Sequence, residues 1–332
     1  MDLLKRYVLP RLLQWVVVVF MGVTITFIIP RLLPTDPVEV ALSRIQSREA
    51  VDPRAAASFR SALEDLYGLK GSLPEQYIAY WRRLLQGDLG PSLGHFPTPV
   101  MQIISKSMPW TVGLLLTSIL ISWVLGVVLG TMSAYSRDRA WSKVLDKSFI
   151  VLMPIPYPIF GLVLVMIFCY YIPIFPLVGG ASGKPALSWP YIRSILKHGF
   201  LPALSLVLGG TAFRFIMARA LASTVISSDY VTYAQLAGVP RNDIVAKYVL
   251  RNTMLPQITD LGLALGAVFG GALITEMIFA YPGIGYSFYT AILQADFNLM
   301  LGVTLFSIVG IATAALLVDL SYPLFDPRVR YR

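Results

Sequence analysis

The sequence predicts an all-α polytopic membrane protein with six transmembrane helices, an external helical cap after the first span and a cytoplasmic loop between spans four and five. Composition, the spacing of charged residues and the distribution of Lys and Arg support this fold class. Of the 332 residues, 56% are hydrophobic and 14% are charged, whereas a soluble domain is about 45–50% apolar and about 25% charged. So few charges cannot cover a globule in water, so the chain belongs in a bilayer.

Six largely uncharged stretches can hold a helix of about 20 apolar residues, the length that crosses a bilayer. The first lies in residues 1–30, which also include a cytoplasmic N-terminus. The other five are expected at about 110–135, 148–172, 200–222, 257–280 and 297–319. The fourth span contains Arg214 and Arg219, whose long side chains can extend toward the lipid headgroups, or else line an exit path.

Residues 31–108 form the predicted external loop or cap, and residues 109–332 form a membrane core that includes the cytoplasmic loop at 223–256. Within the cap, SALEDLYGL and PEQYIAYWRRLLQG are typical of short amphipathic helices. They predict a folded lid over the spans, with a dedicated ligand site as the alternative. Lys and Arg are frequent in the segments that six spans place inside, so both termini are expected to be cytoplasmic.

The sequence also argues against several kinds of chemistry. One Cys and two His are too few for a disulfide framework or a Cys-based zinc site, so no metal site is expected. The net charge of +9 does not indicate nucleic acid, because the basic residues are dispersed between apolar runs. A phosphate-binding loop needs G-x-x-x-x-G-K-[ST], and Gly183-Lys184 is followed by Pro185. We expect no catalytic residues, no cofactor bound by this chain and no ATP hydrolysis by it alone.

Glycines recur every four residues in two spans, at Gly126 and Gly130 and again at Gly262, Gly266 and Gly270. Small residues at this spacing let helices approach closely in lipid. Helix packing is one interpretation, and a pore lining with room for a solute is the other.

Residues 227–259 predict a helix, a turn and a second helix outside the membrane. Asp229 or Ser228 can cap the first helix, and Gly238 suits its C-terminus. Pro240 then begins a second helix that Pro256 is expected to end. Small and aromatic residues share one face of the first helix: Tyr230, Tyr233, Ala234 and Ala237. A soluble partner could hold this element, or it could be only a connecting loop.

This stretch resembles the EAA loop of ABC-transporter permeases, in the longer-spaced form of the dipeptide/oligopeptide/nickel importer family. The matching residues are Asp229, Tyr230, Val231, Ala234, Gly238, Leu250, Arg251, Asn252, Leu255 and Pro256. Further similar elements are RLLPTDP at 31–37, GDLGPSL at 87–93, ITEMIFAYPGIG at 274–285 and DLSYPLFDPRVR at 319–330. The chain departs from the family at Thr35, where Gly is usual, and at 235–237, where Gln-Leu-Ala replaces a basic Arg-Ala-Lys.

The resemblance implies a permease subunit that forms half of the pathway in an ATP-driven, binding-protein-dependent importer. Its partners would be a second, homologous permease in a heterodimer, two cytoplasmic ATPase subunits that bind ATP and Mg, an external solute-binding protein and the lipid bilayer. The location would be a bacterial or archaeal plasma membrane. Short peptides are the expected solute, with oligosaccharides or nickel chelates as alternatives. An ion-coupled secondary carrier is the alternative from another class.

The resemblance and the loop pattern together select the candidate site residues. The residues expected to couple to the ATPase are Asp229, Tyr230, Tyr233, Ala234, Gly238, Pro240, Arg241, Arg251, Asn252 and Pro256. The possible gate or pathway residues are Glu276, Pro282, Gly283 and Arg214. Arg241 and Arg251 are expected to contact either the rim of the partner or lipid headgroups. Asp260 and Asp319 are expected to cap helices or to pair with a neighbouring Arg.

Overall fold

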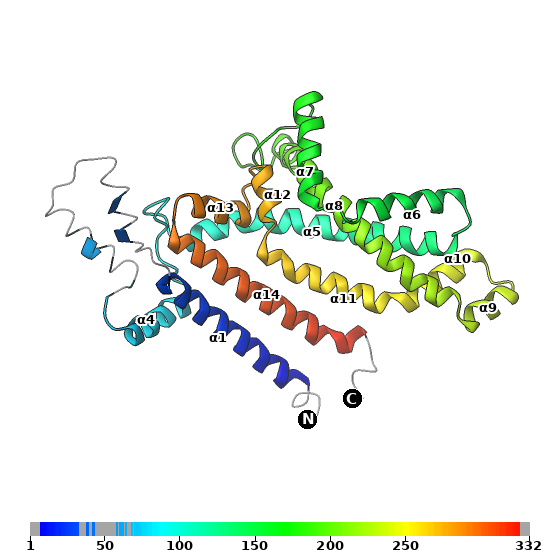
Figure 1. The fold of residues 1–332 in the computed structure, drawn as a ribbon, viewed down its shortest axis with the longest axis horizontal. Helices are drawn as coiled ribbons and strands as arrows, with labels where there is room; N and C mark the ends of the chain where they lie inside the picture. Colours follow the sequence, from blue (N-terminus) through cyan, green and yellow to red (C-terminus); the bar gives the residue numbers. More distant parts are fainter. Residues whose placement is uncertain are drawn as a thin grey trace.

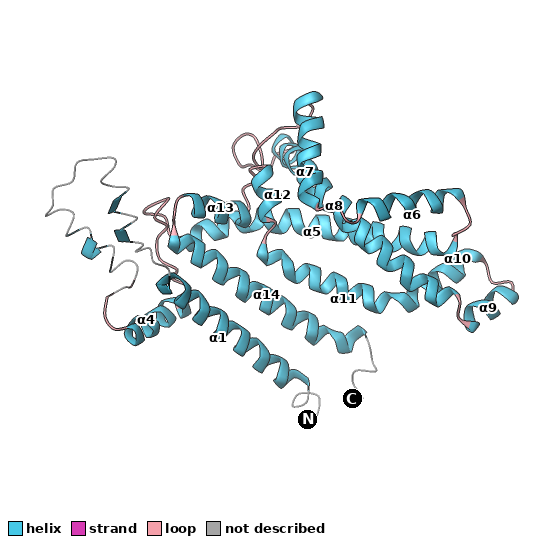
Figure 2. Ribbon diagram, viewed as in Figure 1, coloured by secondary structure: helices cyan, strands magenta, loops and turns pink. Residues whose placement is uncertain are grey.

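The computed structural model describes residues 7–32 and 70–325, together with isolated positions between residues 38 and 68. All regular elements in these residues are helices, as Figure 2 shows, which confirms the all-α prediction. Much of the predicted cap helix at 61–69 and parts of the elements at 31–37 and 319–330 fall outside the described residues. The second predicted cap helix is α4 (Leu73–Leu85).

Within the described residues, four helices are long and apolar enough to cross a membrane. They are α1 (Leu9–Leu32), α5 (Val100–Tyr135), α8 (Trp189–Ile226) and α14 (Phe297–Phe325). Both α5 and α8 are longer than the spans predicted at 110–135 and 200–222. The 36 residues of α5 extend about 54 Å, well beyond a hydrocarbon core of about 30 Å. These two helices therefore project out of the bilayer.

The span predicted at 148–172 is bent rather than straight. It is divided into α6 (Ala140–Leu152), α7 (Tyr157–Val165) and the π-helical η2 (Met166–Tyr171), and the bend is 97°. Three prolines at alternate positions, Pro154, Pro156 and Pro158, explain the bend. Pro156 has extended backbone angles, and each of the three prolines lacks the N–H donor that a continuous helix needs.

The segment predicted to span at 257–280 is also interrupted. It comprises α11 (Arg251–Ala267), the short 3₁₀-helical η4 (Val268–Gly270) and α12 (Leu273–Ile278), with a break at Gly271, whose φ is +73°. Pro256 lies inside α11, so the prediction that it ends the preceding helix is wrong. A single proline removes only one helical hydrogen bond, which neighbouring helices can compensate, and the flanking Thr253 and Gln257 are buried.

The long helices are arranged in a row in which α14 separates α1 from α11, and α11 adjoins the closely packed pair α5 and α8 (Figure 1). α13 (Ile284–Leu293) and α12 lie over α5 at one end. Glycines explain the close approaches. A Cβ on Gly130 would lie 2.5 Å from the Phe215 carbonyl oxygen of α8, and one on Gly262 would lie 2.8 Å from Val318 of α14. The packing interpretation of the two glycine series is confirmed at these positions.

Candidate functional site

The predicted cytoplasmic loop is a compact helical unit between α8 and α11. It contains α9 (Asp229–Leu236), α10 (Arg241–Asp243) and the π-helical η3 (Ile244–Leu250). Gly238 has a φ of +73°. Its N–H donates to the Gln235 carbonyl at 3.1 Å, and the Val239 N–H donates to the Ala234 carbonyl at 3.1 Å. This is a Schellman motif, which confirms that Gly238 terminates the first helix.

One face of α9 is buried against the ends of α5 and α8 and against η3. Val231 and Ala234 pack in an apolar cluster with residues from α5, α8 and η3, namely Ala134, Ala222, Ile244 and Val249. The expectation that Ala234 shares an outer face with Tyr230 and Tyr233 is therefore wrong. The side of the helix that faces outward presents Tyr233, which is 70% exposed, and Leu236, which is 79% exposed.

Leu236 was missed by the sequence reasoning, although it follows Tyr233 by three residues and so lies on the same side of the helix. Tyr230 is 42% exposed on the flank. Asp229 occupies the first turn of α9 and is also exposed. The outer surface of α9 thus combines an aromatic and an aliphatic side chain with a carboxylate near the helix N-terminus, where negative charge is stabilised.

Arg241 is attached to the rest of the protein rather than extended. Its guanidinium donates to the Ser136 hydroxyl just after α5 and lies over the Tyr135 ring, 5.1 Å from the centroid. Pro240 forms the extended residue before α10. These contacts fix the second half of the loop to the end of α5.

The remaining coupling candidates lie at the start of α11. The Asn252 side chain donates to the Tyr248 carbonyl at 2.6 Å, and Arg251 is exposed. Pro256, one turn further, is the proline that α11 accommodates. These three residues therefore belong to the base of the loop rather than to the outer face of α9.

Arg214 forms a buried ion pair instead of extending toward headgroups. Its Nε lies 2.9 Å from Asp260 Oδ2 of α11, and its Nη1 donates to the Ser122 hydroxyl of α5 at 3.0 Å. The Arg214 side chain is only 10% exposed. The snorkelling expected of Arg214 is therefore wrong. Arg219 is also paired, at 2.6 Å from Asp146 of α6, and its side chain is 30% exposed.

Of the two alternatives expected for Asp260 and Asp319, helix capping or pairing with an arginine, the structure shows pairing. Asp260 accepts from Arg214, and Asp319 of α14 lies 3.2 Å from Arg11 of α1. Each pair joins two helices that are distant in sequence. The Arg214–Asp260 pair joins α8 and α11, the two helices that flank the loop of α9, α10 and η3.

Glu276 organises a second cluster, which it shares with Pro282 and Gly283 but not with Arg214. Its carboxylate is fully buried and accepts hydrogen bonds from the Thr111 hydroxyl at 2.9 Å and the Tyr286 N–H at 3.0 Å. A Cβ on Gly283 would lie 2.3 Å from this carboxylate, so only glycine fits there. The carboxylate thus holds the turn between α12 and α13 against α5.

Pro282 closes the outer side of this turn. A Cβ on Gly180 would lie 2.7 Å from Pro282 and 2.8 Å from Trp110, so the loop after η2 packs directly on the proline. The Gly179 N–H donates to the Phe279 carbonyl at 3.1 Å. Three chain segments therefore meet at the Glu276 cluster.

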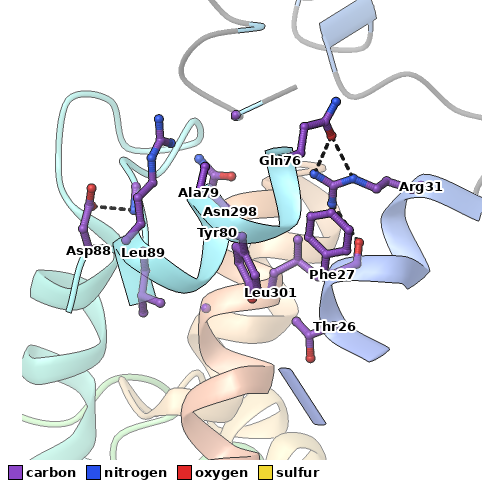
Figure 3. Close-up of a pocket in the computed structure, with 14 residues that line it drawn as sticks. Thr26, Phe27, Arg31, Gln76, Ala79, Tyr80, Asp88, Leu89, Asn298 and Leu301 are labelled. Carbon is purple, nitrogen blue, oxygen red and sulfur yellow. Dashed lines mark hydrogen bonds between the residues drawn. The ribbon is translucent and has the colours of Figure 1, made fainter. Parts of the chain in front are cut away.

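A pocket at the C-terminal end of α1, shown in Figure 3, lies between α1, α4 and α14. Arg31 is part of its lining, but the guanidinium is already bonded to the Gln76 side chain at 3.0 and 3.1 Å and lies 3.5 Å from the Phe27 ring centroid. Its role in this pocket is to hold α4 against α1. In the described part of the chain, no group of three or more His, Cys, Asp or Glu is placed to hold a metal ion.

Sequence reasoning also missed Asp296, which is fully buried beside the GDLGPSL element. Its carboxylate accepts from the Ser92 hydroxyl, from the Gly94 N–H at 2.9 Å and from the Leu299 N–H at 3.1 Å. The carboxylate therefore caps α14 and fixes the loop at 87–98 to it. No local signal links Asp296 to Ser92, since about two hundred residues separate them.

Comparison with known proteins is consistent with this architecture. Residues 126–331 match the family described as the binding-protein-dependent transport system inner membrane component. The chain is 29% identical to the oligopeptide transport system permease protein AppB of Bacillus subtilis, over 99% of this chain and 100% of that protein. It is 31% identical to a putative peptide permease protein of Brucella suis, over 98% of this chain and 99% of that protein.

A third relative is the glutathione transport system permease protein GsiC of Escherichia coli, which is 30% identical over 98% of this chain and 99% of that protein. The matches to all three relatives extend over nearly the whole chain, and the family match includes α9, α10 and η3 as well as Glu276, Pro282 and Gly283. The chain therefore belongs to the family of inner membrane components of binding-protein-dependent transport systems.

Proposed function

We propose that this chain forms half of the translocation pathway for short peptides in an ATP-driven importer. A second, related permease forms the other half, two cytoplasmic ATPase subunits bind ATP and Mg, and an external binding protein delivers the solute. Family membership supports the transport role. The choice of short peptides is supported by relatives named as oligopeptide, peptide and glutathione permeases.

The observation that carries the proposal is the exposed apolar face of α9. Tyr233 and Leu236 are among the most exposed large hydrophobic residues in the described chain. Such side chains on a rigid base mark a contact surface. The Schellman turn at Gly238 and the Arg241 contact with Ser136 provide that base. A partner that grips α9 therefore gains a rigid handle on the membrane helices.

This handle acts on both helices that flank the loop. Val231 and Ala234 pack between the end of α8 and η3, and the Arg214–Asp260 pair joins α8 to α11. Closure of the ATPase dimer would therefore rotate α8 and α11 together, which is the rigid-body motion that opens a transport pathway. The Glu276 cluster with Pro282 and Gly283 would form a fixed outer edge of the gate.

The topology that suits this function has both termini in the cytoplasm and six crossings. In it, α6 with α7 and α11 with α12 each cross as a broken span, and the cap containing α4 lies outside. Broken helices are tolerated at membrane depth where the protein itself satisfies the freed backbone groups. The Ala272 N–H, at the break after Gly271, donates to the Glu276 carboxylate at 3.4 Å.

The test is peptide uptake by the complete complex, reconstituted in vesicles with its binding protein and ATP. Tyr233→Glu places a charge on the α9 face and should abolish uptake and reduce the amount of ATPase that co-purifies with the chain. Tyr233→Phe keeps the ring and should retain both. Uptake at the normal rate by the Tyr233→Glu complex would contradict coupling through α9.

A separate measurement tests the solute. Titration of the binding protein with panels of di- to pentapeptides and of oligosaccharides should show saturable binding of peptides only. Tight binding of an oligosaccharide would redirect the substrate assignment without affecting the ATP-driven mechanism. Uptake by the single purified chain without ATPase subunits would instead support an ion-coupled carrier.

A further inference from the structure

The loop α9–α10 is bordered by a basic groove in which Arg137 and Arg139 have no part in the function proposed above. The groove has a volume of about 580 Å³ and opens to solvent. Its walls come from the α5–α6 turn, the inner end of α8, α9 and α10. The residues that carry the argument are Tyr135, Ser136, Arg137, Arg139, Gln235 and Arg241.

The charge of the groove is positive. Arg137, Arg139 and Arg241 line it together with a single carboxylate, Asp138. The Arg137–Asp138 contact is 4.0 Å long between side chains that are 80% and 94% exposed, so it neutralises little charge. The groove therefore offers a net positive potential and hydroxyl groups to a negatively charged occupant.

The groove is a built surface rather than a gap between mobile loops. Arg241 bridges its walls by donating to Ser136 and lying over Tyr135. The Gln235 side chain donates to the Tyr135 hydroxyl at 3.5 Å from the opposite side. Its floor rests on the apolar cluster that includes Ala134, Val231 and Ala234. Arg241 thus occupies a position fixed relative to α9, and Arg137 and Arg139 are exposed on the turn that directly follows Ser136.

Because α9 is too short to form a whole interface, the ATPase contact must extend beyond α9, and the groove is the adjoining surface. The eight residues of α9 form a helix about 12 Å long, which is too small to provide the roughly 800 Å² that each partner contributes to a stable interface. A partner seated on Tyr233 and Leu236 must therefore also cover a flank of α9. Gln235 lies on the flank that borders the groove.

The depth of the groove favours protein over lipid as the occupant. Among the described residues, the Arg219–Asp146 pair is the ion pair of α8 nearest its C-terminal end. The groove residues Ser223 and Ser227 lie four and eight residues after Arg219, and Ser227 directly follows α8. With the hydrocarbon core taken to end at this pair, the spacing corresponds to about 6–12 Å, which reaches or exceeds the thickness of one headgroup layer, about 5–7 Å. An anionic headgroup would have to leave its layer to fill the groove.

We propose that the basic groove between the α5–α6 turn and α9 receives an acidic segment of the cytoplasmic ATPase subunit. The inference rests on the proposed function and adds a second, electrostatic contact to the apolar one on α9. Arg137 and Arg139 supply this contact from a part of the chain that is about one hundred residues before the loop. The apolar face of α9 provides the grip, and the groove sets the orientation of the partner.

The experiment compares two charge reversals in the complete complex, purified in nanodiscs through a tag on this chain. Arg137→Glu/Arg139→Glu should reduce retention of the ATPase about fivefold at about 0.1 M NaCl, with the difference largely lost at about 0.5 M. Lys143→Glu/Lys147→Glu changes the same charge on exposed residues of α6 outside the groove and should leave retention unchanged. The milder Arg137→Gln/Arg139→Gln should give a smaller loss of the same kind.

Each other outcome overturns the proposal. Equal retention by the wild type and by both groove variants, with Tyr233→Glu still defective, would reject the groove while leaving the α9 contact intact. Retention that Tyr233→Glu also fails to reduce would reject the proposed coupling itself. A loss that depends on the fraction of phosphatidylglycerol in the nanodiscs would assign the groove to anionic lipid, and an equal loss in the Lys143→Glu/Lys147→Glu control would show a general charge effect.

Discussion

The junction of α5, α8 and α11 and the pair formed by α1 and α14 are held together in different ways. At the junction, Arg214 bonds Asp260 and Ser122, and the Trp123 indole donates to the Gln257 carbonyl at 2.8 Å. These contacts are largely buried, and 44% of the most apolar window of α8 is buried, against 17% for α1. The junction is therefore more deeply buried than α1, and its helices are joined by polar groups.

The α1–α14 pair is joined mainly by shape and by contacts near its ends. A Cβ on Gly22 would lie 2.6 Å from Ile308, and Trp15 donates to the Thr313 hydroxyl at 3.1 Å. The Arg11–Asp319 pair is 38% and 29% exposed. Polar contacts of this kind are weaker because solvent and headgroups compete for them.

The difference indicates which helices must move as one body. The junction lies directly behind the loop that the ATPase is proposed to grip, so its buried polar contacts keep α8 and α11 in register with α5. The α1–α14 pair lies at the edge of the row and can tolerate loosening. Four predictions follow this contrast, beginning with the largest expected effect.

The first prediction concerns the two ion pairs. Arg214→Ala leaves Asp260 without its partner in a largely buried position and should destabilise the protein by about 3 kcal/mol. Arg11→Ala removes an exposed pair and should cost less than about 1 kcal/mol. The midpoints of thermal unfolding in detergent measure both effects.

A double variant separates the lost pair from the stranded charge. Arg214→Leu/Asp260→Leu removes both charges, so it should be more stable than Arg214→Ala alone, because no unpaired carboxylate remains. Equal destabilisation by Arg214→Ala and Arg11→Ala would contradict this contrast. The polar contacts of the junction would then stabilise the protein no more than those of the α1–α14 pair.

The second prediction concerns the glycines of α5. Gly130→Ala would place a methyl group 2.5 Å from the Phe215 carbonyl oxygen and should cost about 2 kcal/mol through forced separation of α5 and α8. Gly113 lies in the same helix with no atom within 4 Å of its Cβ position. Gly113→Ala should be neutral, or stabilising by up to about 1 kcal/mol from helix propensity. If both variants unfold at the same temperature, close approach at Gly130 is unimportant.

The glycines also show what sequence can predict. Their four-residue spacing is a local property, and it correctly predicted close packing at Gly130 and Gly262. Prolines were less informative, because Pro256 lies within a continuous helix whereas three alternate prolines produce the bend after α6. The number of helical hydrogen bonds lost, and the neighbours available to replace them, decide the outcome.

The candidate site was predicted in part for the same reason. Helical period placed Tyr233 on α9 correctly, but only the packing of Val231 and Ala234 against α8 and η3 determines which side faces outward. Arg214 and Asp260 are 46 residues apart in sequence and lie on different helices, so their pairing depends on how α8 and α11 pack. Such long-range contacts leave no local pattern, so sequence reasoning offered pairing and capping as equal alternatives.

The third prediction compares two tryptophans. Trp123→Phe at the junction leaves the Gln257 carbonyl without its side-chain donor and should cost about 1 kcal/mol. Trp15→Phe at the edge frees a threonine hydroxyl that also donates to the Val309 carbonyl at 2.7 Å, so the loss should be about 0.5 kcal/mol. Unfolding midpoints again provide the measurement, and a larger effect at Trp15 would reverse the ranking of the two regions.

The fourth and smallest effect lies in the cap helix α4, which is attached to α1 rather than to the junction. The Ser72 backbone N–H and hydroxyl both donate to the Glu75 carboxylate at 2.8 Å. These hydrogen bonds favour the charged form and lower the pKa of Glu75 below its ordinary value. A lowered folded-state pKa means that the contribution is complete above the unfolded pKa of about 4.3 and is lost as pH falls through the folded pKa.

Acidification to about pH 3 should therefore loosen the first turn of α4. A spin label at Leu73→Cys, in a Cys169→Ala background, should become more mobile below about pH 4.3. The same label in a Glu75→Gln protein should show little change with pH, because the amide does not titrate in this range. Identical pH profiles for the two proteins would mean that the carboxylate does not hold the turn, and that the aromatic contacts of Tyr77 and Trp81 with α1 are sufficient to fix the cap helix at the edge of the row.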